Sequence, residues 1–258
     1  MTASAYSTAW MPWQARRAKG RQMHVSMKLP SPLSIIAVLW LLSGASAARA
    51  QSEQFWPEID TYVGINKHTR FSLFVAKTRE DRTTTDGEIG PNFDLYFQRL
   101  REMKPIAGTR LDQAKSQRMM FRVGYRYLPS TGSATNRVFF EVTGRHYMKG
   151  GLMIADRNRG EINVVEGERY WRYRNRISFE RPLTIARHEF TPYARAEFYY
   201  DGRYSKFSRT AIDVGCVFPF WKRFEIEPYY EHQNDTAKSP NRQVNAFGIV
   251  LSVYFRPQ

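Results

Sequence analysis

The sequence predicts an all-β protein, a single up-and-down antiparallel transmembrane β-barrel of about 12 strands, with about 10 as the alternative. Three observations support this prediction. Apolar and polar residues alternate with the two-residue period of a β-strand along most of the chain. Many alternating segments run for about ten residues, whereas globular strands are typically about 5–6 residues and tilted membrane-spanning strands about 9–11. No stretch after residue 50 resembles a transmembrane helix.

The alternation is clearest over residues 168–181. One phase is mainly apolar and aromatic, and it consists of Trp171, Tyr173, Asn175, Ile177 and Phe179. The other phase consists of Arg172, Arg174, Arg176, Ser178 and Glu180. A soluble sandwich would bury the apolar face, whereas a membrane barrel turns that face to lipid and the charges to its lumen. The length of the segments favours the barrel.

About eleven strand-like segments follow one another along the chain, separated by turn-like or charged stretches. They cover residues 56–65, 70–79, 92–100, 118–128, 137–147, 151–159, 169–181, 189–200, 208–218, 224–233 and 243–255. Bacterial single-chain barrels have even strand numbers, so we expect about twelve strands, one of them a weak strand before residue 118. The alternative is a barrel of about ten strands in which residues 151–159 form a loop.

The N-terminus has the pattern of a secretory signal peptide. A basic start at Lys28 precedes an apolar run over residues 33–42, and small residues follow up to Ala50. We expect cleavage between Ala50 and Gln51. The apolar run is too short for a spanning helix, which needs about 20 residues.

This pattern divides the chain into a signal peptide, residues 1–50, and an exported outer-membrane barrel domain, residues 51–258. Residues 1–22 carry no structural pattern, and they lie upstream of two alternative starts, Met23 and Met27. The domain prediction implies a Gram-negative bacterium, because the signal directs the chain across the inner membrane and the barrel is of the outer-membrane type.

The connections between the segments differ in length. Asp201-Gly202 and Gly150-Gly151 have the chemistry of tight hairpin turns. Two longer polar stretches, residues 80–90 and 103–117, are predicted to be extracellular loops, and the second can hold a short helix.

The chain is basic, with 39 Lys and Arg against 24 Asp and Glu and a net charge of +15. Residues 1–50 hold six of the bases and no acid, so cleavage would leave +9. The arginines stand at strand spacing and form no basic patch or arm, which argues against a nucleic-acid partner. We expect outer-membrane lipids, lipopolysaccharide and the outer-membrane assembly machinery as partners. The single cysteine, Cys216, allows no intramolecular disulfide.

The polar phases of the predicted strands place a network of charges in the lumen. Its members are Arg118, Arg122, Arg126, Glu141, Arg172, Arg174, Arg176, Glu180, Arg195, Glu197, Arg209, Asp213, Glu225, Glu227 and Glu231, to which the first strands can add Glu58, Asp60 and Asp94. Buried ions cost several kcal/mol each unless they are paired. The network is therefore either a structural Arg–Glu lattice or a basic path for anionic solutes, and residue type does not separate the two.

The residues indicate no catalytic or metal site. A barrel lipid hydrolase would need a serine activated by a histidine. None of His68, His146, His188 and His232 stands two residues before a serine. The histidines are scattered, and no glycine-rich loop indicates a phosphate-bearing group, so we expect no metal and no cofactor.

The run Arg-Tyr-Trp-Arg-Tyr-Arg-Asn-Arg at residues 169–176, preceded by Asp-Arg-Asn-Arg at 156–159, resembles the central signature of the bacterial DUF2490 family. Three further pieces are similar in order and spacing: Phe55-Trp56, residues 193–200 with Glu197, and Ser208-Arg209 before residues 212–215. The resemblance implies an outer-membrane β-barrel without an assigned activity, so it supplies no catalytic residue. One departure is the C-terminus, where three residues follow the aromatic Phe255 that such barrels usually end on.

The sequence therefore predicts an outer-membrane β-barrel with an Arg/Glu-rich lumen, either structural or a small or closed passive channel. Two alternatives remain open: a lipid-hydrolysing or lipid-modifying barrel enzyme, and a soluble periplasmic β-protein that binds an anionic ligand.

Overall fold

The computed structural model describes residues 52–80, 83–99, 112–130, 132–185, 188–237 and 239–255. The predicted signal peptide and its cleavage site lie outside the described residues, as do the three residues after Phe255 and most of the predicted loop at 103–117. None of the described helices is long and apolar enough to cross a membrane.

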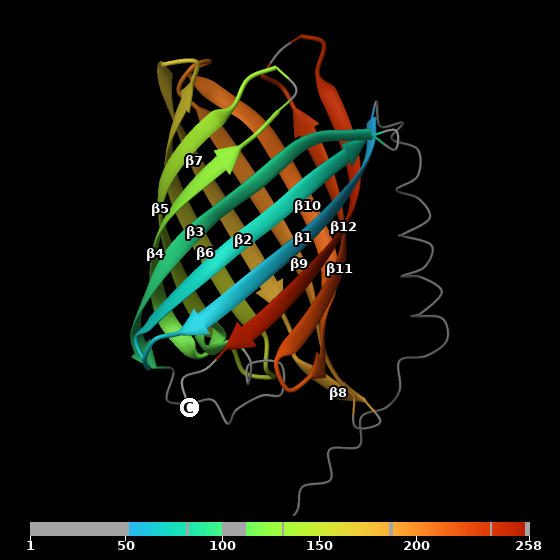
Figure 1. Cartoon of the computed structure of the whole chain (residues 1–258). Helices are drawn as coiled ribbons and strands as arrows, with labels where there is room; N and C mark the ends of the chain where they lie inside the picture. Colours follow the sequence, from blue (N-terminus) through green and yellow to red (C-terminus); the bar gives the residue numbers. More distant parts are fainter. Residues whose placement is uncertain are drawn as a thin grey trace, which may run out of the picture. The chain divides into compact units, whose positions relative to one another are not determined.

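The described residues form twelve β-strands and one short 3₁₀ helix. These are β1 (Ser52–Gly64), β2 (Thr69–Glu80), β3 (Thr83–Arg99), η3 (Gln113–Ser116), β4 (Gln117–Leu128), β5 (Thr135–Tyr147), β6 (Met153–Val165), β7 (Glu168–Glu180), β8 (Leu183–Ile185), β9 (His188–Asp201), β10 (Lys206–Trp221), β11 (Phe224–Asp235) and β12 (Arg242–Phe255). All except β8 form the closed wall of a barrel, in which each strand pairs with the next along the chain (Figure 1).

The wall closes between β1 and β12, which pair in parallel from Ser52 opposite Val244 to Val63 opposite Phe255. All other neighbours in the wall are antiparallel hairpin pairs, including β7–β9 and β9–β10. The pair is parallel because eleven strands alternate in direction, which leaves the first and the last pointing the same way.

The predicted all-β barrel is confirmed, and each of the eleven predicted segments coincides with one wall strand. The total of twelve strands includes β8, a three-residue strand that pairs only with β9. It is not a missed strand before residue 118, and residues 151–159 belong largely to β6 rather than to a loop. A barrel made only of antiparallel neighbours needs an even number of strands. This wall can have eleven strands because its first and last strands, β1 and β12, pair in parallel.

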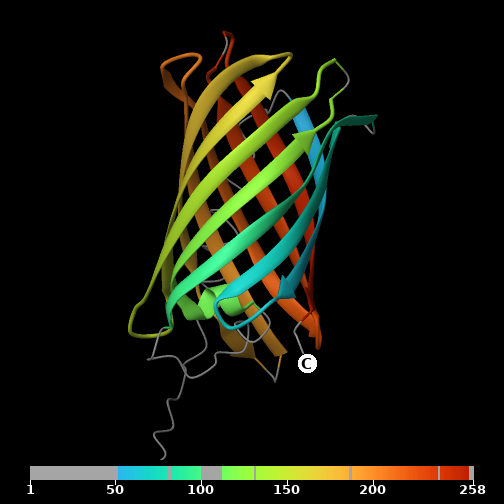
Figure 2. The same ribbon diagram turned by 60° about the vertical axis from the view of Figure 1, so that its left-hand side comes forward.

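Most wall strands have an apolar outer face and a polar inner face, whereas the inner face of β12 carries small and apolar residues such as Ala246 and Val250. In β5 the neighbours Phe140 and Glu141 are 54% and 1% exposed, because one points outward and the other into the barrel. A 12-residue strand such as β4 is about 40 Å long at about 3.3 Å per residue. Tilted by about 45°, it crosses about 28 Å, close to the thickness of a hydrocarbon core. The tilt of the strands is visible in Figure 2.

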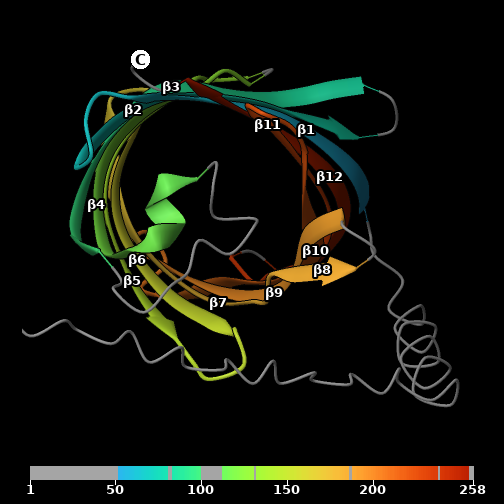
Figure 3. The ribbon, with the colours of Figure 1, turned by 90° about the horizontal axis from the view of Figure 1, so that it is seen from below.

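The two stretches predicted to be loops, residues 80–90 and 103–117, both contain regular secondary structure. Residues 83–90 belong to β3, because β2 supplies antiparallel partners as far as Thr83 opposite Glu80. The described part of the second loop contains η3, the short helix that the sequence allowed. This helix lies inside the ring of strands near one end of the barrel (Figure 3).

Candidate functional site

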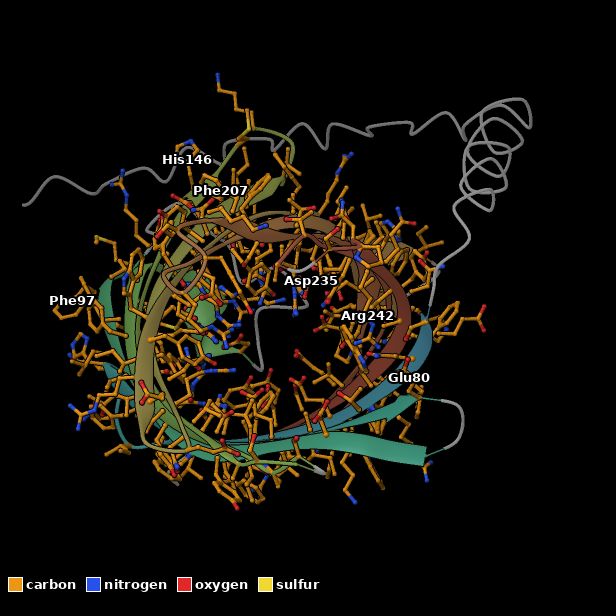
Figure 4. The ribbon with its side chains drawn as sticks, turned by 90° about the horizontal axis from the view of Figure 1, so that it is seen from above. Glu80, Phe97, His146, Phe207, Asp235 and Arg242 are labelled. Carbon is orange, nitrogen blue, oxygen red and sulfur yellow. The ribbon has the colours of Figure 1, made fainter. Side chains whose placement is uncertain are left out.

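The barrel encloses a polar cavity of about 750 Å³. Its lining reaches from Arg242 at the start of β12 to Tyr254 near the end of that strand, so the cavity follows almost the whole length of the wall. Figure 4 looks into the barrel from above, with Asp235 and Arg242 on the inner side and Phe97 pointing away from the wall. A second cavity of about 170 Å³ lies beside η3.

Fourteen of the fifteen charged residues predicted for the lumen line one or both cavities. Those on the large cavity are Arg122, Arg126, Arg172, Arg174, Arg176, Arg195, Glu197, Arg209, Asp213, Glu225, Glu227 and Glu231. Glu141 and Glu180 line the small cavity. Arg118 is different: it is exposed at the start of β4 and lines neither cavity. It is the second residue of the strand, at the rim of the wall, where its side chain reaches solvent.

The strand register aligns charges from six neighbouring strands in one row of cross-strand partners on the inner face of the wall. From β2 to β7 the aligned residues are Arg70, Asp94, Arg122, Glu141, Arg159 and Arg174. Asp94 contacts arginines on both sides, at 2.7 Å from Arg70 Nη2 and 2.6 Å from Arg122 Nε. Cross-strand neighbours lie close enough for such pairs, so the register creates a ladder of ions across the wall.

Glu161 on β6 is the centre of the densest group. Its carboxylate lies 2.6 Å from Arg172 Nη2, 3.1 Å from Arg174 Nη1, 3.6 Å from Arg137 Nε and 3.7 Å from Arg159 Nη1. The Glu161 side chain is 0% exposed. The contacts with Arg172 and Arg174 are charge-assisted hydrogen bonds, which are among the stronger ones in proteins. Glu161 therefore joins β6 firmly to β7, and the longer contact with Arg137 extends the group to β5.

Glu197 on β9 is a second centre, with Arg157 Nη2 at 2.6 Å, Arg174 Nε at 2.8 Å and Arg176 Nε at 3.3 Å. Arg159 lies 2.6 Å from Glu141. We call the following nine residues the central cluster: Arg137, Glu141, Arg157, Arg159, Glu161, Arg172, Arg174, Arg176 and Glu197. Six arginines share three glutamates, so the central cluster carries a net charge of +3.

Four carboxylates on strands β1 and β11 contrast with the central cluster. Within the described part of the chain, Glu58, Asp60, Glu225 and Glu231 have no cationic nitrogen within 4 Å, and all four line the large cavity. Two of them accept hydrogen bonds from neutral hydroxyl groups: Tyr62 donates to Asp60, and Tyr254 donates to Glu225. The lumen therefore contains an arginine-rich part and a carboxylate part.

Two ion pairs hold η3 inside the barrel. Asp112 accepts a 2.7 Å contact from Arg70 Nη1, and Lys115 Nζ lies 2.9 Å from Glu180. Tyr147 Oη donates to the Lys115 carbonyl oxygen at 2.8 Å.

The charged groups of Lys115 in η3 and of its cap residue Asp112 each lie beside a group of opposite charge. Burial alone would raise the pKa of Asp112, but Arg70 and Lys115 outweigh it and lower that pKa. Burial alone would lower the pKa of Lys115, but Glu180 and Glu225 outweigh it and raise that pKa. Both groups are therefore charged at neutral pH.

Sequence reasoning did not place several charged residues in the lumen. The main ones are Arg70, Glu88, Asp112, Lys115, Arg137, Arg157, Arg159 and Glu161. The signal for the β6 residues was present, because Arg157, Arg159 and Glu161 alternate with outward residues up to Val165. The predicted segment stopped at residue 159, so Glu161 was left out. Asp112 and Lys115 follow no strand pattern and carry no comparable signal.

The four histidines that the structure describes lie away from the lumen. His68, His146 and His188 are exposed, and His232 is on the outer phase of β11 with Nδ1 2.8 Å from Asn245 Oδ1. Among the residues that the structure describes, no group of three or more His, Cys, Asp or Glu side chains is arranged to hold a metal ion.

A family model described as "Protein of unknown function (DUF2490)" matches residues 53–244. No protein with a curated description matches the chain.

Solved structures share only a distant likeness with the chain. The β domain of the Bordetella autotransporter BrkA has 12% identity and a TM-score of 0.43, and the match covers 71% of this chain and 83% of that one. A bacterial polysaccharide outer membrane secretin has 8% identity and a TM-score of 0.41, with 70% and 73% covered. A loop-deletion mutant of OmpT from Vibrio cholerae has 12% identity and a TM-score of 0.31, with 76% and 95% covered.

Proposed function

The chain belongs to the DUF2490 family, whose function is unknown, and we propose that it is an outer-membrane β-barrel that acts as a narrow passive channel for small polar solutes. The observation that carries this proposal is the charged cavity of about 750 Å³ along the lumen. A barrel that served only as a rigid wall could fill its interior with side chains. This barrel instead keeps an open cavity that is lined by charged side chains.

The outer face supports the membrane part of the proposal. Large apolar side chains are exposed on every wall strand, among them Ile59, Phe140, Ile162, Trp171, Ile212 and Phe247. A soluble protein rarely exposes so many apolar side chains in one continuous belt, whereas lipid surrounds such a belt favourably. Lipopolysaccharide and outer-membrane lipids would contact this belt, and the outer-membrane assembly machinery would insert the barrel.

The central cluster would set the ion preference of such a channel. With its net charge of +3 it attracts anions, and rings of arginine are used in pores that pass anions. The helix η3 narrows the lumen at one end, where Asp112 and Lys115 line both cavities. We therefore expect a small conductance with some preference for anions.

The test is single-channel recording in planar bilayers with the purified barrel. We expect discrete conductance steps and a reversal potential that favours chloride over potassium in a salt gradient. The variant Lys115→Met, which loosens η3, is recorded alongside. If neither protein conducts at any voltage, although both show the heat-dependent gel shift of a folded barrel, the channel proposal is wrong and the charges serve as a structural lattice.

A further inference from the structure

The charges that line the large cavity are segregated by strand. Strands β4 to β7 contribute eight arginines to the lining, namely two each from β4 and β6, one from β5 and three from β7, and no carboxylate. Strands β11, β12 and β1 contribute one arginine, Arg242, and six carboxylates: Glu58, Asp60, Glu225, Glu227, Glu231 and Asp235. We call the first surface the basic wall and the second the acidic wall.

The two walls face each other across the lumen. Two strands, β2 and β3, separate them on one side of the barrel, and β9 and β10 separate them on the other. Figure 3 shows β4, β5 and β6 on one side of the ring and β1, β11 and β12 on the opposite side. A solute in the cavity is therefore exposed to positive charge on one flank and negative charge on the other.

Two of the six carboxylates of the acidic wall, Glu227 and Asp235, form ion pairs with arginines of β9 and β10, and the other four do not. Glu58, Asp60, Glu225 and Glu231 have no cationic nitrogen within 4 Å in the described part of the chain. Glu225 is the most informative of them, because it is only 4% exposed and its Oε1 has no hydrogen-bond partner there. A buried carboxylate oxygen without a partner is costly, so this position favours a ligand that donates hydrogen bonds and carries positive charge.

The acidic wall also has room for such a ligand. Its middle strand, β12, presents small side chains to the lumen, including Ala246 and Ser252. The register places Trp56 of β1 and Tyr229 of β11 on either side of Gly248. A Cβ atom at Gly248 would overlap the Tyr229 ring, so the ring lies directly on the strand. Aromatic faces flanking carboxylates attract ammonium groups through cation–π contacts.

These observations point to the class of solute. An ion of one sign is attracted by one wall and repelled by the other, whereas a dipolar solute can orient so that both of its ends are attracted. We propose that the lumen selects small zwitterions, with the ammonium group toward the acidic wall and the carboxylate toward the basic wall. This inference rests on the proposed channel function and names its solute class.

The experiment compares solute entry into proteoliposomes by isosmotic swelling at pH 7. Three probes of similar size are used: glycylglycine, the sodium salt of N-acetylglycine, and the neutral polyol erythritol. We expect glycylglycine to enter about fivefold faster than erythritol, the factor that corresponds to about 1 kcal/mol for one ion contact at 4 Å in water. Equal rates for the three solutes would overturn the zwitterion proposal and leave the channel standing. Absence of entry by any solute would instead count against the channel itself.

Matched variants test whether the acidic wall is responsible. The double change Glu58→Gln and Asp60→Asn removes two unpaired carboxylates and should abolish the advantage of glycylglycine while increasing entry of N-acetylglycine. The control Glu53→Gln removes one carboxylate from β1 at an exposed position outside the cavity lining and should change neither rate. Heat-dependent gel shifts confirm that the variants are folded. If the double variant keeps the full preference for glycylglycine, the acidic wall does not select the solute.

Discussion

At the scale of single residues, the lumen depends on carboxylates that several arginines share. Glu161 has four arginines within 4 Å and Glu197 has three. A shared acid is harder to replace than any one of its bases, because its loss leaves several like charges facing one another in a confined space. Acids and bases of the central cluster should therefore respond differently to substitution.

The change Glu161→Gln should destabilise the barrel by about 3 kcal/mol, because it leaves buried arginines without their common partner. The measurement is the urea midpoint of unfolding in lipid vesicles, followed by tryptophan fluorescence. Glu168→Gln provides the control, since Glu168 is exposed at the start of β7 and loses the same charge. An unchanged midpoint for Glu161→Gln would mean that water in the lumen, rather than this carboxylate, compensates the arginines.

The change Arg174→Ala should destabilise less, by about 2 kcal/mol, the contribution of a hydrogen bond to a charged group. Both of its acids keep another close arginine, since Arg172 stays 2.6 Å from Glu161 and Arg157 stays 2.6 Å from Glu197. The same unfolding assay gives the stability, and bilayer recording should show a weaker preference for chloride. A loss of stability equal to that of Glu161→Gln would contradict the sharing of partners.

At the scale of elements, η3 is the part of the lumen that does not belong to the wall. It has one residue in the small buried group Tyr96, Ala114 and Met120. The ion pairs of Asp112 and Lys115 and the hydrogen bond from Tyr147 also hold it. Few apolar contacts and a short length make such an element easier to displace than a wall strand.

Lys115→Met should widen the lumen, because it keeps most of the side-chain volume but removes the contact with Glu180. We expect single-channel conductance to rise about twofold, since the constriction limits the flow of ions. Lys149→Met is the matched control, as Lys149 is exposed in the turn between β5 and β6. Equal conductance in both variants would show that η3 does not narrow the ion path.

At the scale of the whole molecule, the odd number of wall strands has a topological consequence. The start of β1 and the end of β12 lie at opposite ends of the barrel, because these strands are parallel neighbours. In a barrel with an even number of strands, both would lie at the same end. Two labelling sites therefore distinguish the two architectures.

Cysteines placed at Glu53 and at Phe255, each in a Cys216→Ser background, should react with an impermeant maleimide from opposite sides of the membrane. On intact cells we expect one of the two to be labelled and the other to require disruption of the outer membrane. Labelling of both from the same side would contradict the parallel closure and support the barrel of ten or twelve wall strands.

The fold class followed from the sequence because its signal is local. Whether a residue of β7 points inward or outward is decided by its place in a two-residue alternation, so Arg172, Arg174 and Arg176 could be placed on one face without knowing any neighbour. The ends of β3 and β6 were harder to predict, because polar strand residues near the rim resemble loop residues until their partner strand is known.

The sequence by itself determined that the chain is a β-barrel with an apolar exterior and an ionic lumen. Strand alternation and segment length depend only on residues that are neighbours in the sequence. Only the tertiary structure decided the parallel pairing of β1 with β12, the sharing of Glu161 by four arginines and the position of η3 inside the ring. It also separated the acidic wall from the basic wall. These features depend on register and strand order, and pairing between distant segments sets both.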